Sequence, residues 1–277
     1  MKGDRGKDPG TPRGSKSAVT PQPVWDAGQY GRFRSERSRP YFDLLARVDG
    51  NSLGRIADVG CGDGQLTRTL QDRWPDATIW GIDSSKEMLD RAPAGPRRDQ
   101  LRFIHADLRE WHPPAPLDLV VSNAVLHWVP DHAEVLRAFA GWLESNGTVA
   151  VQIPNNRSEP AYRAIGALAA EPPWAERLRG VDREAVVESP AFYIAQLSAL
   201  GFETDLWETI YTHRLARASE IVEWLKGTTL RPILSVLSGD EALRFCAALT
   251  ARVAPLYPEG PQGVLFPFRR LFFVATR

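Results

Sequence analysis

Three glycines at alternate positions are the strongest chemical signal in this sequence. Gly60, Gly62 and Gly64 follow the short apolar segment 55–59 and precede a helix-like segment, 65–73. Glycine carries no side chain to block a ligand, and it reaches backbone angles that are closed to other residues. The N–H groups of such a turn, together with the positive end of the helix, can face a nucleotide or a carboxylate. The order of strand, glycine turn and helix therefore predicts a binding cradle.

An acidic residue lies where such a cradle needs one. Asp83 closes a second apolar segment, 77–82, and lies 19 residues after Gly64. In dinucleotide-binding folds, an acidic residue about 20 residues past the turn accepts hydrogen bonds from the ribose hydroxyls. Its two oxygens suit a cis-diol. A glycine turn that merely joins strand to helix is the alternative, and it gives no reason for an acidic residue at this place.

The spacing of the glycines distinguishes two ligands. Turns that bind NAD read G-x-G-x-x-G, whereas this turn reads G-x-G-x-G, with Asp58 two residues before the first glycine. The pattern D-x-G-x-G-x-G resembles the first motif of the class I S-adenosylmethionine-dependent methyltransferases. The resemblance implies S-adenosylmethionine as the cofactor, bound along the carboxyl ends of the strands. The cofactor-binding residues that it implies are Asp58, Gly60, Gly62, Gly64, Asp83, Ser84, Met88, Asp107, Leu108 and Asn123.

Some of these residues have a second interpretation. Met88 either packs beneath the adenine or belongs to the core. Asp107 ends the apolar segment 101–106; in the methyltransferase pattern it accepts from the adenine amino group, but it can also cap a turn. Ser84, with Glu87 three residues on, predicts a capping box at the start of a helix.

Asn123 follows the fourth apolar segment, 117–122, and so is expected at the tip of a central strand, where α/β sheets bind ligands. The sequence from Asn123 reads NAVLHWVP. It resembles the fourth motif of the same superfamily, but it lacks the N/D-P-P-Y/W form of the amino methyltransferases. This difference argues against a base amine as the methyl acceptor.

Composition excludes several functional classes. The chain has 277 residues, of which 43% are hydrophobic and 25% charged, and its formal net charge is zero. A nucleic-acid binder usually shows a basic excess, and a spanning helix needs about 20 apolar residues in a row. Neither is present, so we expect no nucleic acid and no membrane. Cys61 and Cys246 are the only cysteines, which favours a reducing cytoplasm, and no Cys/His spacing suits a metal.

The alternation of strand-like and helix-like segments predicts an α/β fold. We expect a Rossmann-like, seven-stranded, mainly parallel sheet with its last strand antiparallel, helices on both faces and a helical cap from C-terminal insertions. Residues 24–277 form one methyltransferase domain in this interpretation, with a cofactor-binding core at 55–153. A substrate-side helical elaboration with the last strands follows at 154–270. Residues 1–23 are rich in Gly, Pro, Lys and Ser and predict a disordered leader, native or left by cloning.

Within the later part, Ser189 and Pro190 predict a helix start, and the final strands are expected at 202–215 and 271–275. Ahead of the core, an aromatic cluster (Trp25, Tyr30 and Phe33) precedes a helical segment, 41–48. That helix either packs on the surface of the sheet or forms a lid over the cofactor.

A closer resemblance rests on several segments in the same order. These are SERSRPYFDLLARV, the glycine turn, SNAVLHWVPDH, VQIPNN, TLRP and the ending RLFFVATR. Together they resemble the trans-aconitate 2-methyltransferase family over about 25–277. The resemblance implies a cytoplasmic enzyme, a monomer or simple homodimer, that esterifies one carboxylate of a small tricarboxylate. Asp63 stands where the family usually has proline, and His127 where glutamine is common.

A carboxylate acceptor has a pKa of about 4 and is already ionised at neutral pH, so it needs no general base. Catalysis by positioning is then expected, with His127 and Trp128 beside the acceptor, although Trp128 is also interpretable as plain core. Arginine forks suit the remaining carboxylates, but each arginine could equally be structural. The candidates for substrate binding are Arg39, Tyr193, Arg231, Arg269 and Arg270.

Two other functions remain open on the sequence. One is a methyltransferase on another small acceptor, such as a malonyl thioester or a quinone precursor. The other is a non-catalytic S-adenosylmethionine-binding module.

Overall fold

The computed structural model of the chain describes residues 34–50, 52–93, 99–181 and 186–277. The predicted leader and the aromatic cluster at Trp25, Tyr30 and Phe33 lie outside these ranges.

The described residues form one seven-stranded sheet in the order β3-β2-β1-β4-β5-β7-β6. Strands β1 to β5 are parallel, and β7 runs antiparallel to both β5 and β6. The predicted α/β fold with an antiparallel last strand is therefore confirmed. The strands are β1 Arg55–Val59, β2 Thr78–Asp83, β3 Leu101–His105, β4 Leu117–Asn123, β5 Leu143–Pro154, β6 Glu203–Leu215 and β7 Val264–Thr276.

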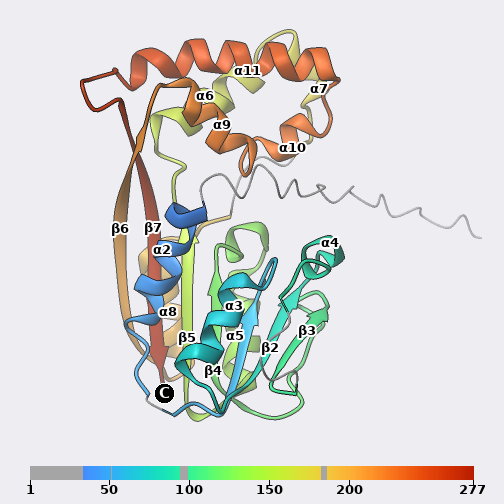
Figure 1. Cartoon of the computed structure of the whole chain (residues 1–277), viewed down its shortest axis with the longest axis vertical. Helices are drawn as coiled ribbons and strands as arrows, with labels where there is room; N and C mark the ends of the chain where they lie inside the picture. Colours follow the sequence, from blue (N-terminus) through green and yellow to red (C-terminus); the bar gives the residue numbers. More distant parts are fainter. Residues whose placement is uncertain (1–33, 51, 94–98, 182–185) are drawn as a thin grey trace, which may run out of the picture.

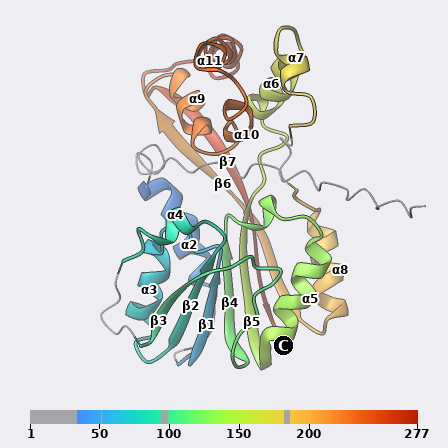
Figure 2. The ribbon, with the colours of Figure 1, turned by 90° about the vertical axis from the view of Figure 1, so that its right-hand side faces the viewer.

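Helices cover both faces of the sheet and one of its ends. Figures 1 and 2 show α2 and α3 on one face, α5 and α8 on the other, and a helical cap above the carboxyl ends of the parallel strands. The cap consists of α6, α7, α9, α10 and α11. The helices are α2 Arg34–Leu45, α3 Gln65–Arg73, α4 Lys86–Leu89, α5 His132–Trp142, α6 Pro160–Ala169, α7 Trp174–Arg177, α8 Pro190–Ala199, α9 Ser219–Lys226, α10 Arg231–Leu234 and α11 Gly239–Val253, with 3-10 turns η1 Leu126–Trp128 and η2 Ala254–Leu256.

Three local predictions were wrong in detail. Helix α2 starts at Arg34 rather than at Tyr41 and contains Pro40. Strand β7 starts at Val264 rather than Leu271, because its apolar alternation continues through a proline at position 267. The N-cap of α4 is Ser85, not Ser84; its hydroxyl accepts from the Met88 N–H.

Strands β6 and β7 both run from the sheet into the cap (Figure 1). The first half of β7 places Val264, Phe266 and Phe268 in the cap core, together with Trp224 of α9 and Phe245 of α11. The second half of β7 continues into the hydrophobic cores on both faces of the sheet. The β6–β7 ladder therefore extends from the sheet into the cap and holds the cap over the carboxyl ends of the parallel strands.

A buried carboxyl connects two helices to β1. Asp58 accepts hydrogen bonds from Thr67 Oγ1 of α3 at 2.7 Å and, more weakly, from the Tyr41 hydroxyl of α2 at 3.5 Å. Burial raises the pKa of Asp58 to about 7, against the lowering effect of these two hydrogen bonds. Because Asp58 is almost fully buried, its ionised form costs free energy in the folded protein.

The first glycine of the turn lies against Val125, two residues after the end of β4. Gly60 has a φ of +75°, and a Cβ at this position would lie 2.1 Å from Val125 Cγ2. Its N–H donates to the Ile82 carbonyl at 2.7 Å. A side chain here would meet both a strained backbone angle and a clash.

We expect Gly60→Ala to destabilise the protein more than Gly180→Ala. Gly180 has the same φ, but a Cβ added there would meet no atom within 4 Å. Both variants carry the left-handed strain, about 1–2 kcal/mol, and only Gly60→Ala adds overpacking, about 1–3 kcal/mol. Urea unfolding of the two variants measures the difference, and equal losses would show that Val125 gives way freely.

Asp58 predicts a pH-dependent stability of the protein without cofactor. Its pKa is higher in the folded state than in the unfolded state, so the folded state binds the extra proton between about pH 4 and pH 7. The free energy of unfolding should therefore fall as the pH rises through about 7. Asp58→Asn cannot ionise, and its stability should gain on the wild type between about pH 5 and pH 8. Urea unfolding at pH 5 and pH 8 tests this, with the exposed Asp49→Asn variant as control. A difference in free energy of unfolding between Asp58→Asn and wild type that is the same at both pH values would contradict a raised pKa of Asp58.

Candidate active site

A cavity of about 660 Å³ lies at the carboxyl ends of β1, β2 and β4. The chain passes from β1 to β2 on one side and returns to β4 on the other, so the strand order reverses at β1. Ligands in open α/β sheets bind at such a switch point. Of the residues proposed from sequence, the cavity is lined by Asp58, Gly60, Gly62, Asp83, Ser84, Met88, Asp107, Leu108, Asn123, Trp128 and Arg231.

The glycine turn is fastened to the end of β2. The Gly62 N–H donates to Asp83 Oδ2 at 2.8 Å, and the Ser85 N–H donates to Asp83 Oδ1 at the same distance. Each oxygen keeps a lone pair for a further donor. Burial raises the pKa of Asp83. The third glycine, Gly64, does not line the cavity.

The side chain of Arg109 orients the Asp107 carboxylate. Arg109 donates to Asp107 Oδ1 through its backbone N–H and Nε, both at 2.9 Å, and to Oδ2 through Nη2 at 2.5 Å. The guanidinium lowers the pKa of Asp107. Arg109 also lines the cavity, and it was not proposed from sequence. The available signal was a basic residue two positions after Asp107.

Asn123 presents an unsatisfied acceptor at the cavity. Its Oδ1 is buried and has no hydrogen-bond partner among the described residues. The next residue, Ala124, has a φ of +58°, and its N–H donates to the Gln152 carbonyl at 2.9 Å. A non-glycine residue in this region stores strain, as residues at functional sites often do. An acceptor left unpaired at a strained strand end indicates a ligand with a polar donor.

The charge of the cavity is uneven. Four carboxyl groups line it, from Asp58, Asp63, Asp83 and Asp107, and burial raises the pKa of Asp58 to about 7. The lining cations are Arg109, which is paired with Asp107, and Arg231 of α10. The glycine-turn side therefore suits a ligand that carries positive charge and hydroxyl donors, as S-adenosylmethionine does.

Helix α2 is both a packing helix and part of the site, so the two interpretations of the segment 41–48 do not exclude each other. Tyr41 is buried against the sheet, while Ser38, Tyr41 and Phe42 line the cavity. None of the three was proposed from sequence. The signal available was an aromatic pair on a helix that precedes a nucleotide-binding turn.

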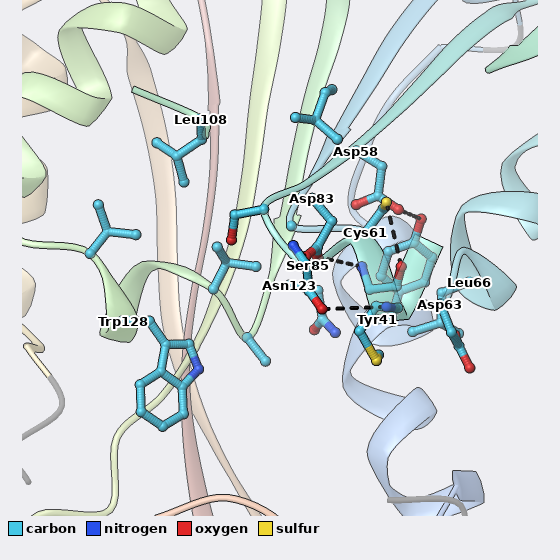
Figure 3. Close-up of a pocket in the computed structure, with 18 of the residues that line it drawn as sticks. Tyr41, Asp58, Cys61, Asp63, Leu66, Asp83, Ser85, Leu108, Asn123 and Trp128 are labelled. Atoms are coloured by element: carbon cyan, nitrogen blue, oxygen red, sulfur yellow. Dashed lines mark hydrogen bonds between the residues drawn. The ribbon is translucent and has the colours of Figure 1, made fainter. Parts of the chain in front are cut away.

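The side chains of His127 and Trp128 lie in different environments. Trp128 lines the cavity and is 46% exposed, so its interpretation as plain core was wrong. Figure 3 shows it on the opposite side of the pocket from Asp63 and Leu66. His127 is buried and does not line the cavity. Burial, with the charges of Arg270 and His132, lowers the pKa of His127 to about 3.

Tyr193 is a core residue, and its prediction as a substrate contact was wrong. It is fully buried on α8. Its hydroxyl lies 2.7 Å from His132 Nδ1 and accepts from the Glu188 N–H at 3.2 Å. The remaining His132 nitrogen lies 2.8 Å from the Leu126 carbonyl, so the hydroxyl is saturated inside the protein.

Only one of the four candidate arginines lines the cavity. Arg231 does so. Arg39 is exposed, 3.7 Å from Asp43. Arg269 donates to Glu208 at 3.2 Å and lies outside the cavity lining. Arg270 is buried and donates to Gln152 Oε1 at 3.2 Å.

The described ranges lack two kinds of feature, a membrane-spanning helix and a cluster of metal ligands. None of their helices combines the length and the apolar character that a bilayer crossing requires. No cluster of three or more His, Cys, Asp or Glu side chains there has the arrangement of a metal site.

Comparison with known folds agrees with this geometry. The YcgJ protein of Bacillus subtilis has a TM-score of 0.56 at 15% identity, over 86% of this chain and 97% of that chain. Phosphoethanolamine N-methyltransferase 2 of Haemonchus contortus, solved in complex with S-adenosyl-L-methionine, has a TM-score of 0.52 at 15% identity, over 86% and 52%. At these identities the likeness shows a shared fold.

Sequence comparison defines the family. A methyltransferase domain model matches residues 33–204. The trans-aconitate 2-methyltransferase of Streptomyces avermitilis is 44% identical over 92% of this chain and 97% of its own length, and that of Streptomyces coelicolor is 45% identical over 92% and 87%. The enzyme of the same name from Azoarcus sp. is 42% identical over 92% and 100%. This chain therefore belongs to the trans-aconitate 2-methyltransferase family of S-adenosylmethionine-dependent methyltransferases.

Proposed function

We propose that this protein transfers a methyl group from S-adenosylmethionine to one carboxylate of trans-aconitate, or of a closely related small tricarboxylate, and forms a monomethyl ester. The observation that carries the proposal is the charge pattern of a single cavity. Carboxylates of β1 and β2 and the glycine turn line one part of it, and Arg231 joins the lining from the cap. The name shared by the relatives, trans-aconitate 2-methyltransferase, supports the choice of acid.

The cofactor end belongs to the strand tips in this proposal. S-adenosylmethionine supplies an electrophilic methyl group on a sulfonium. Asp83 accepts from the ribose hydroxyls, and Asp107, oriented by the Arg109 fork, accepts from the adenine amino group. Asn123 Oδ1 accepts from a donor of the amino-acid portion. Leu108 and Met88 contribute apolar surface, with Met88 already packed into the wall.

The acceptor end requires binding rather than proton transfer. The acid is ionised at neutral pH, with a carboxyl pKa of about 4. His127 is neutral at that pH because its pKa is about 3. Arg231 orients the acid, and Trp128 and Phe42 exclude water from the approach of oxygen to methyl. Orientation of this kind can supply about 7–11 kcal/mol.

The remaining assignments extend the same proposal. Residues 55–153 serve as the cofactor-binding core, and residues 154–270 carry the substrate-side elaboration. We further propose a cytoplasmic enzyme that acts as a monomer or a simple homodimer and has no nucleic-acid partner.

Labelled S-adenosylmethionine and a panel of acids test the proposed function. We expect transfer of label into a base-labile ester of trans-aconitate, with weaker transfer to dicarboxylates. Malonyl thioesters and phenolic quinone precursors serve as competing acceptors. If label is transferred to one of those acceptors and to none of the acids, that acceptor takes the place of the proposed substrate. Binding of S-adenosylhomocysteine without any transfer instead indicates a cofactor-binding module.

Arg231→Ala tests the acid-binding role of the cap. Loss of one charged hydrogen-bonding partner costs about 1.5–3 kcal/mol, so KM for trans-aconitate should rise about 10- to 100-fold. KM for S-adenosylmethionine should change little. Arg244→Ala, at an exposed position on α11, is the matched control. Equal rises in both KM values, or none, would exclude Arg231 from the acid site.

A further inference from the structure

A buried guanidinium lies next to the cavity wall. Arg270 of β7 is 5% exposed, and its Nη1 donates to Gln152 Oε1 of β5 at 3.2 Å. Its guanidinium carbon lies 4.5 Å from the centre of the Phe268 ring. Alternation along the strand places Arg270 on the same sheet face as Phe272, whose side chain packs in the core beneath α2. This is the face on which α2 closes the cavity.

Two residues near this cation each carry a polar atom without a hydrogen-bond partner among the described residues. Gln152 is fully buried, and its Nε2 has no hydrogen-bond partner among the described residues. Gln152 pairs in register with Asn123 of β4, which lines the cavity. His127 is likewise buried with an unpartnered Nδ1, close enough to Arg270 for the guanidinium charge to act on it. Buried polar groups are normally satisfied, so neighbouring exceptions need an explanation.

The cap approaches the same place from the other side. Tyr162 of α6 hydrogen-bonds to Thr229, and the charge of Arg270 acts on its hydroxyl. Thr229 lies two residues before Arg231, the cap arginine that lines the cavity. Arg270 from the sheet and Arg231 from the cap therefore flank one region between the two layers.

We propose that Arg270, Gln152 and His127 form the binding subsite for a carboxylate of the substrate that is not methylated. Two neutral donors, Gln152 Nε2 and His127 in its Nδ1–H tautomer, and one cation meet the requirements of a carboxylate. The subsite makes a second carboxylate a condition for tight binding, so a monocarboxylic acid is a poor substrate. The inference rests on the proposed function, because it concerns the same acid.

Access to the subsite involves rearrangement of side chains. Arg270 and Gln152 are covered in this structure and do not line the cavity. An acid that enters along Asn123 reaches them when the covering side chains change rotamer.

The test measures the affinity of trans-aconitate for protein saturated with S-adenosylhomocysteine. Arg270→Gln should weaken acid binding about tenfold or more, and Gln152→Leu by a smaller factor, with the affinity for S-adenosylhomocysteine unchanged. Arg269→Gln is the matched control, because Arg269 is adjacent in sequence, lies on the other face of β7 and pairs with Glu208. It should bind the acid as the wild type does.

A second readout separates recognition from a structural role. The wild type should favour trans-aconitate over a monocarboxylic acid in kcat/KM, and Arg270→Gln should lose most of that preference. A purely structural role lowers both values equally and overturns the proposal, as does unchanged acid affinity in both variants. If Arg270→Gln fails to bind S-adenosylhomocysteine, Arg270→Lys and His127→Gln replace it. Weakened acid binding in either supports the subsite, and unchanged binding in both overturns it. Wild-type protein that binds no acid contradicts the proposed function itself.

Discussion

The insertion of β7 between β5 and β6 is the constraint on which the rest of the structure depends. Its antiparallel pairing with β5 runs from Thr148 to Pro154, and its pairing with β6 extends over the full length of both strands. Half of β7 is buried in the cap and half in the sheet. Hydrogen bonds of two ladders therefore set the position of the cap relative to the strand tips (Figure 2).

This constraint brings residues of distant sequence position to one place. Helix α9 lies between β6 and Arg231 in the chain, and Arg270 lies within β7 itself. The glycine turn and Asp83 belong to the first third of the chain. A rigid connection between these parts matters because in-line transfer tolerates little displacement of either reactant.

Charge is distributed according to the same geometry. The carboxylates gather where the first parallel strands end, and Asp58 is buried deeply enough that its pKa reaches about 7. Arg231 lies in the cap and Arg270 in β7. Arg39 and Arg269, by contrast, are paired with Asp43 and Glu208. Burial and pairing thus distinguish four arginines that look alike in sequence.

The sequence by itself determined the fold class, the glycine turn, the acidic residues at the strand ends and the family. These features are local: each depends on residue types within one strand–turn–helix unit, and periodicity reports such units directly. Tertiary structure alone decided which distant side chains meet. The Tyr193 hydroxyl lies within hydrogen-bonding distance of His132 in the core. Trp128 is exposed at the cavity, and Tyr41 and Arg109 also line it. The physical reason is that burial and pairing depend on contacts between segments far apart in the chain, which local spacing does not encode.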